Sequence, residues 1–254
     1  MSKFVLLIVS LFLCFNLFSQ ETRTIHVFVA LCDNKNQGIV PVSKLVGNGQ
    51  DTKNNLYWGA GYGVKTYFSA SAEWQLISKT IKPGGHILER LLYKHKSSKT
   101  YMLADAYDGA YIKETTIDFL KASYGASDLR ISADSMTLHF GGGSDLIAYI
   151  GHDGLMDFQL SFDVLPKTNK KRDLIILACA SKQYFRGFIN KSGAYPLLWT
   201  TNLMCPEAYT LKSALDGWIS NESVDQVRER AAKTYSQFQK CSLIGSKKLL
   251  ITGW

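Results

Sequence analysis

The chain has 254 residues, of which 46% are hydrophobic and 20% are charged, and its formal net charge is +8. This length can bury a substantial core and fits one large domain more readily than two. The basic residues are scattered, with tight clusters only at 170–172 and 247–248, each beside an apolar run. Because such clusters are typical of a solvated face, we expect no nucleic-acid partner.

The first 19 residues have the pattern of a cleavable export signal. A lysine precedes an almost wholly apolar segment from Phe4 to Phe18, and the small residue Ser19 follows it. The segment is shorter than the roughly 20 residues that a membrane-spanning helix needs, and no later apolar run is long enough to span. We therefore expect residues 1–19 to be a signal peptide and residues 20–254 to be one exported domain, periplasmic or secreted, without an integral membrane segment after cleavage.

In the first half of the chain, β-branched and apolar residues predict a buried strand over 24–31. A second strand is expected over 76–81. Two further apolar runs, 87–93 and 100–106, flank a short polar turn, a pattern that fits either a hairpin or a helix-to-strand connection. Apolar residues at helical spacing then predict a helix over 111–124.

The second half is more regular, with short apolar runs at 146–150, 174–178 and 195–199. Helical patterns follow at 207–219 and 224–239, and a last strand is expected over 249–252. Short apolar runs without alternation are typical of buried parallel strands, and interleaved helices indicate that both faces of the sheet are covered. The predicted fold is a three-layer α/β/α sandwich with a mostly parallel sheet, in which 146–150 and 174–178 are adjacent parallel strands.

Two reactive side chains stand just after two of these predicted strands. His152 follows the run at 146–150, and Cys179 follows the run at 174–178. Active sites of open parallel sheets lie beyond the carboxyl ends of the strands, so the two side chains are expected to face one another. A cysteine in this position can attack a peptide carbonyl, while the histidine lowers the thiol pKa or protonates the leaving amine.

The segments LIAYIGHDG and LIILACAS resemble the His and Cys motifs of the caspase-fold cysteine peptidases. The interval between His152 and Cys179 is similar to that of the separase and CHAT branch, and the block from Tyr195 to Ile219 is similar to the segment that follows there. The resemblance covers roughly residues 146–219. It implies a caspase-like fold and a Cys179/His152 catalytic dyad.

The same resemblance implies further site residues. The family places a glycine directly after its histidine, where a backbone N–H binds the oxyanion, whereas this chain has Asp153 before Gly154. Gly154 is thus the candidate oxyanion donor, together with the N–H of Cys179. Three residues at the end of the next strand are candidates for substrate binding: Trp199, Thr200 and Thr201.

Four cysteines remain after residue 19: Cys32, Cys179, Cys205 and Cys241. Two disulfides would be possible in an oxidising compartment, although the spacing does not match a disulfide-rich scaffold. CxxC pairs and an HExxH motif are absent from the sequence, so we predict no metal site. No organic cofactor is implied either.

Two functions are consistent with these features. The first is an exported cysteine endopeptidase that hydrolyses peptide bonds of a protein or peptide substrate. The alternative is a catalytically inactive caspase-like domain that binds a protein or peptide at the cell envelope, which the intervening Asp153 favours. The sequence indicates neither the substrate preference nor the oligomeric state.

Overall fold

The computed structural model describes residues 21–38, 41–168 and 170–254. The expected signal peptide, residues 1–19, therefore lies outside the described residues. In chain order, the elements are β1 (Arg23–Ala30), α1 (Val64–Ser69), β2 (Trp74–Gly84), β3 (Ile87–His95), β4 (Thr100–Tyr107), α2 (Ile112–Ser123), β5 (Asp128–Ala133), β6 (Met136–Gly141), β7 (Leu146–Gly151), β8 (Asp173–Leu177), α3 (Ser181–Ser192), β9 (Tyr195–Thr200), α4 (Ala208–Ile219), α5 (Val224–Gln239), α6 (Leu243–Leu249) and β10 (Leu250–Ile251).

The fold is α/β and is built on one 8-stranded sheet with the strand order β10-β9-β8-β7-β1-β4-β3-β2. Strands β9, β8, β7, β1 and β4 are parallel to their neighbours in this series. The outer strands β10, β3 and β2 run antiparallel to the strands that they join. Strands β7 and β8 pair in parallel, so the prediction for 146–150 and 174–178 is confirmed.

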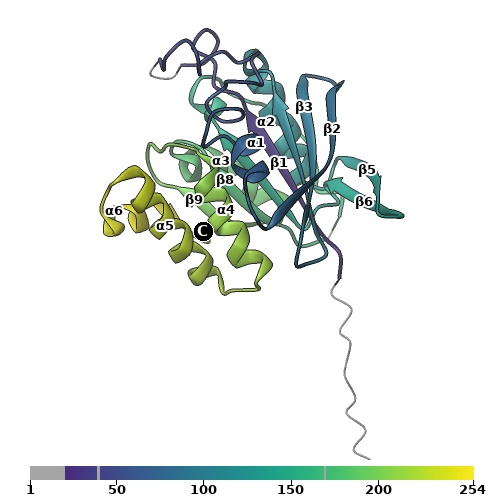
Figure 1. The fold of residues 1–254 in the computed structure, drawn as a ribbon. Helices are drawn as coiled ribbons and strands as arrows, with labels where there is room; N and C mark the ends of the chain where they lie inside the picture. The colour runs from purple at the N-terminus through teal and green to yellow at the C-terminus, as the bar shows by residue number, and fades with distance from the viewer. Residues whose placement is uncertain (1–20, 39–40, 169) are drawn as a thin grey trace, which may run out of the picture.

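Helices cover both faces of the parallel part of the sheet (Figure 1). Alternate residues of β7 point to opposite sides: Ile150 joins the core beneath α1, α4 and α5, whereas Tyr149 joins the core beneath α2 and α3. Because both faces are buried, each central strand is apolar along its whole length. This explains the uninterrupted hydrophobic runs in the sequence.

Several elements were not predicted from the sequence. Helix α3 is mostly polar, and its buried apolar residues, Phe185 and Ile189, form only a narrow stripe. The helix begins at Ser181, immediately after the turn that ends β8. The β5–β6 hairpin and the short helices α1 and α6 were also missed. The ambiguous segment around 96–99 is the turn of the β3–β4 hairpin.

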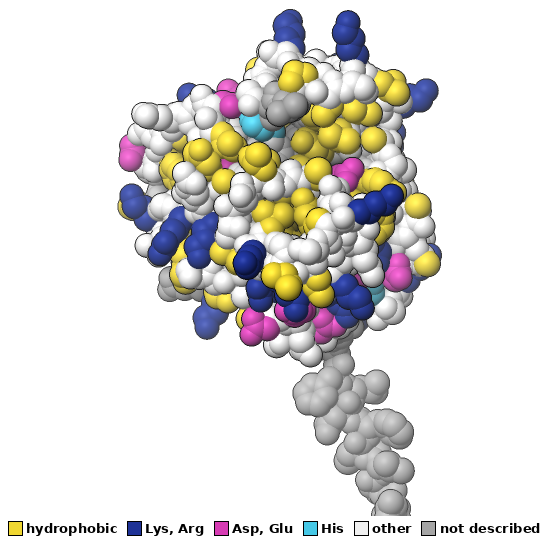
Figure 2. All heavy atoms as spheres, turned by 90° about the vertical axis from the view of Figure 1, so that its left-hand side faces the viewer, with side chains coloured by type: hydrophobic (Ala, Val, Ile, Leu, Met, Phe, Trp, Pro, Cys, Tyr) yellow, Lys and Arg dark blue, Asp and Glu magenta, His cyan; other side chains and the backbone are white. Residues whose placement is uncertain are grey.

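The described residues include no helix that is both long enough and apolar enough to cross a membrane. On the face that carries α6, Lys and Arg side chains lie mostly around the periphery and are interspersed with acidic side chains (Figure 2). Hydrophobic side chains gather nearer the middle of this face, around hollows.

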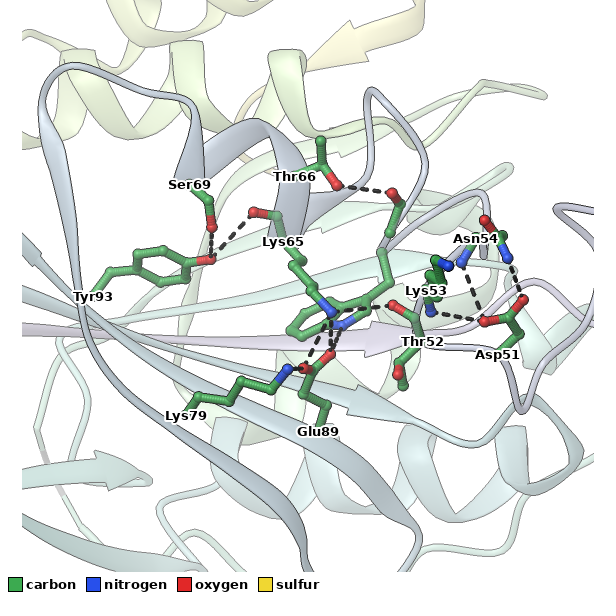
Figure 3. Close-up of polar contacts among 12 residues, drawn as sticks. Asp51, Thr52, Lys53, Asn54, Lys65, Thr66, Ser69, Lys79, Glu89 and Tyr93 are labelled. Carbon is green, nitrogen blue, oxygen red and sulfur yellow. Dashed lines mark hydrogen bonds and ion pairs between the residues drawn. The ribbon is translucent and has the colours of Figure 1, made fainter.

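A buried ion cluster attaches the loop after β1 to the antiparallel end of the sheet. The fully buried carboxylate of Glu89 on β3 contacts Lys65 Nζ at 2.9 Å and Lys79 Nζ at 2.5 Å (Figure 3). Trp58 donates its indole N–H to the same carboxylate. Burial alone would raise the pKa of Glu89, but these hydrogen bonds, from Lys79 first, lower it below its ordinary value. The cluster fixes the segment that also contains Tyr57.

Candidate active site

The sheet brings His152 and Cys179 to one edge. Ile150 of β7 pairs with Leu177 of β8, and His152 and Cys179 each lie two residues beyond this pair. Since the strands are parallel and adjacent, both residues leave the carboxyl edge of the sheet at equivalent positions. Both line the same cavity of about 430 Å³, a volume in the range of ligand-binding pockets.

The backbone turns sharply just after Cys179. Ala180 has φ 49° and ψ 31°, the left-handed conformation that L-residues other than glycine seldom adopt. The turn directs the chain from β8 into α3, whose first residue is Ser181. A non-glycine residue in this conformation must be held by its surroundings, and such sites are often functional.

Thr200, at the end of β9, holds this turn in place. Its hydroxyl accepts a hydrogen bond from Ser181 N at 3.0 Å and contacts the carbonyl oxygen of Ala178. Its backbone N–H donates to Ser181 Oγ at 2.9 Å. Thr200 is fully buried, so the structure assigns its contacts to the β8–α3 turn.

An aspartate that sequence reasoning missed contacts His152. Asp157 Oδ2 lies 2.6 Å from His152 Nε2, and the imidazole is almost fully buried. This contact orients the ring and leaves Nδ1 as the nitrogen for proton transfer. The aspartate comes five residues after the histidine, and the single turn of 3₁₀ helix Gly154–Met156 brings it back. A carboxylate within one turn of a candidate histidine was the available sequence signal.

The Cys179 thiol is held by the backbone of Met204. Met204 N–H donates to Cys179 Sγ at 3.4 Å, and the thiol lies 3.6 Å from the Met204 carbonyl oxygen. Burial raises the pKa of the Cys179 thiol, the Met204 N–H opposes this, and the nearby Asp153 carboxylate raises the pKa further. The N-terminus of α3, two residues away, favours the thiolate. In the resting site the thiol is therefore protonated near neutral pH, contrary to the expectation of a lowered thiol pKa.

The cavity walls are mostly apolar. Tyr57 from the loop after β1 is buried there, and the segment from Leu203 to Glu207 forms the opposite side. This segment contributes Cys205, which is exposed and is the second cysteine, after Cys179, among the described residues that line the cavity. Sequence reasoning did not associate Tyr57 with the site, because it lies far from both motifs along the chain. It included residues 203–207 in the block that resembles the segment after the cysteine motif, but named none of them as a site residue.

Asp153 is fully buried, and one of its oxygens has no hydrogen-bond partner among the described residues. Its Oδ1 accepts from Leu155 N at 3.0 Å and so caps the 3₁₀ turn. Burial raises the pKa of Asp153 to about 7, with a smaller contribution from Asp157. The residue that separates His152 from Gly154 thus has a structural role in the turn.

The hydroxyl of the buried Tyr149 donates to the His152 carbonyl oxygen at 2.7 Å, within the segment that precedes Gly154. Gly154 is not among the described residues that line the cavity, whereas Gly151 is. The oxyanion role of Gly154 stays a prediction.

The other three predicted site residues do not line this cavity. Trp199 is fully buried in the core beneath α2 and α3 and contacts Trp254 edge-to-face. Thr200 supports the turn after Cys179, as described above. Thr201 lines a neighbouring hollow beside α6, and its hydroxyl donates to the Lys248 carbonyl oxygen at 2.8 Å.

All four described cysteines are free. Within residues 21–38, 41–168 and 170–254, no group of three or more His, Cys, Asp and Glu side chains is arranged to hold a metal ion. Comparison with protein-family models, with curated proteins and with solved structures gave no match for this chain. The functional argument therefore rests on the geometry of the site.

Proposed function

We propose that this chain is an exported cysteine endopeptidase of caspase-like, three-layer α/β/α fold, with Cys179 as nucleophile and His152 as general acid and base. The observation that carries the proposal is that both residues line one cavity at the carboxyl edge of adjacent parallel strands. The helices on both faces of the sheet are consistent with the fold. The contact between Asp157 and the buried His152 ring supports the assignment further.

The residues present can carry out peptide hydrolysis in two steps. His152 Nδ1 removes the thiol proton as Cys179 Sγ attacks the carbonyl carbon, and the imidazolium then gives this proton to the leaving amine. A thioester remains on Cys179. His152 then removes a proton from water as the water attacks the thioester, and the carboxylic acid is released. The imidazolium returns this proton to the Cys179 thiolate. Asp157 stabilises the imidazolium in both steps.

The protonated resting thiol selects one version of this mechanism. Because burial raises the pKa of Cys179, the thiolate is disfavoured before substrate binds. Proton removal by His152 accompanies attack, so the first step needs a neutral imidazole and a protonated thiol in the same molecule.

An inactive peptide-binding domain is the second candidate. The raised pKa of Cys179 favours it, since a binding domain needs no reactive thiol. In this case the same cavity would hold a peptide without cleaving it.

Cleavage of an unfolded, carboxymethylated protein, followed by mass spectrometry, separates the two. We expect Cys179→Ala to reduce cleavage by about 1,000-fold or more and Asp157→Asn to reduce it by roughly 10- to 100-fold. Cys241→Ala is the matched control, because Cys241 is another free cysteine that does not line the cavity, and it should retain activity. Cleavage that survives in Cys179→Ala refutes the nucleophile assignment. Saturable peptide binding without cleavage by the wild type establishes the binding domain instead.

A further inference from the structure

We infer that the site takes an extended polypeptide, with a large apolar side chain in the central cavity next to the scissile bond and flanking residues in hollows on both sides. This inference rests on the proposed function. It goes beyond it by naming the substrate class.

The chemistry of the cavity wall indicates the apolar preference. The wall is formed mainly by Val42, Leu56, Tyr57, Met156, Met204 and Pro206, and no Lys or Arg is among the described residues that line it. Most of the wall carries no charge, so a charged substrate side chain would lose its hydration here without gaining an ion pair. An apolar side chain is stabilised when it leaves water for this wall.

Glu207 is the one acidic side chain that lines the cavity among the described residues. Its Oε2 already accepts hydrogen bonds from Tyr209 Oη at 2.8 Å and Gln239 Nε2 at 3.2 Å. Burial raises the pKa of Glu207, and the Tyr209 hydroxyl opposes this. The carboxyl group is thus engaged by its own neighbours, which makes it a weak partner for a substrate cation.

Two open hollows continue from the central cavity. Met156 lines both the cavity and a hollow formed with Tyr184 and Phe188. On the other side, Leu203 lines both the cavity and the hollow beside α6 that includes Lys248. Each flanking hollow thus adjoins the cavity at one shared wall residue, and the inferred groove crosses these two residues with Cys179 and His152 between them.

The shared residues are unusually exposed for their type. Leu203 is 67% exposed and Met156 is 39% exposed, and hydrophobic side chains gather around hollows on the face that carries α6 (Figure 2). Exposed apolar side chains that adjoin a pocket are typical of a surface that binds a partner. A substrate that crosses the dyad from one hollow to the other is cleaved internally, which fits an endopeptidase.

A matched series of fluorogenic decapeptides tests the substrate class. The peptides differ only at the residue before the cleaved bond, which is Leu, Phe, Lys or Asp. We expect kcat/KM for Leu and Phe to exceed that for Lys and Asp by about 10-fold or more, and Glu207→Gln to leave this order unchanged. A preference for Lys that Glu207→Gln abolishes would overturn the apolar assignment and make Glu207 the specificity residue.

The groove is tested by a pair of exposed leucines. Leu203→Asp should lower kcat/KM for the Leu decapeptide by about 10-fold, mainly through KM. Leu165→Asp should leave it unchanged, since Leu165 is 80% exposed and lines none of these hollows. Equal effects of the two variants, or equal cleavage of a decapeptide and a tripeptide, would overturn the groove. If neither the peptides nor the unfolded protein are cleaved, the proposed function itself fails; cleavage without the expected preference overturns the inference alone.

Discussion

At the scale of single residues, Asp153 shows how one buried carboxyl group affects the neighbouring chemistry. Its pKa is raised to about 7 because it is buried with one unpartnered oxygen, and its charge in turn raises the pKa of the Cys179 thiol. Asp153 therefore disfavours the thiolate form of Cys179. It also caps the turn that carries Asp157 toward His152.

Asp153→Asn should make the Cys179 thiol more reactive. The amide can still accept the hydrogen bond from Leu155 N but carries no negative charge, so the thiolate is less disfavoured. We expect half-maximal labelling by iodoacetamide to occur at a lower pH than in the wild type, measured by peptide mapping of native protein from pH 6 to 10. Asp163→Asn, on the exposed segment that follows the turn, is the control and should not move the curve. An unchanged curve for Asp153→Asn would show that Asp153 does not act on the thiol.

At the scale of elements, the site depends on the junction between β8 and α3. Ala180 adopts a left-handed conformation there, and Thr200 of β9 ties Ala178 and Ser181 to the neighbouring strand. Thr200, which the sequence predicted to bind substrate, thus holds the turn that carries Cys179. It acts on Cys179 through the backbone.

Thr200→Val should loosen this junction without altering the cavity wall. The substitution leaves Ser181 N without its side-chain acceptor in a buried place, which costs about 1–3 kcal/mol of unfolding free energy. We expect kcat to fall by roughly 10-fold with little change in KM, because substrate contacts remain while the thiol is misplaced. Thr200→Ser restores the hydroxyl and should recover most of the activity. If Thr200→Ser is as impaired as Thr200→Val, the methyl group and its packing are responsible and the positioning role is wrong.

At the scale of the whole molecule, the cysteines bear on where and how the chain works. Cys32, Cys179, Cys205 and Cys241 are all free, so no covalent cross-link joins the described residues. Stability then comes from the two cores on either side of the sheet and from buried ion pairs such as that of Glu89. A domain of this size can bury enough apolar surface to fold without disulfides.

Thiol titration of the mature protein checks this arrangement. After unfolding in guanidinium without reductant, we expect four thiols per chain, and in the native state fewer, because Cys32 is fully buried. Burial and the adjacent Asp33 also raise the pKa of Cys32 to about 11, which further slows its reaction. A chain that still carries the first 19 residues would show five thiols, since Cys14 lies there. Fewer than four would reveal a disulfide and contradict the free cysteines.

Local patterns in the sequence are sufficient to predict the parallel sheet and to place His152 and Cys179 at one edge of it. Buried parallel strands must be apolar on both faces, so the runs at 146–150 and 174–178 were visible without long-range information. A residue that follows such a run lies at the carboxyl edge of the sheet. Because β7 and β8 are parallel neighbours, His152 and Cys179 lie at the same edge. Helices with a broad apolar stripe, such as α4 and α5, were predicted for a similar local reason.

The surroundings of His152 and Cys179 depend on long-range packing and are not visible in the local sequence. Asp157 reaches His152 through a turn whose geometry depends on the buried cap of Asp153. Tyr57 and Met204 line the cavity because distant segments fold over the edge of the sheet. The burial of Thr200 and the raised pKa of the Cys179 thiol depend on the same long-range packing. The position of a residue at the end of a strand predicts the edge of the sheet at which its side chain emerges. The neighbours and hydration of that side chain are set by segments far away in the sequence.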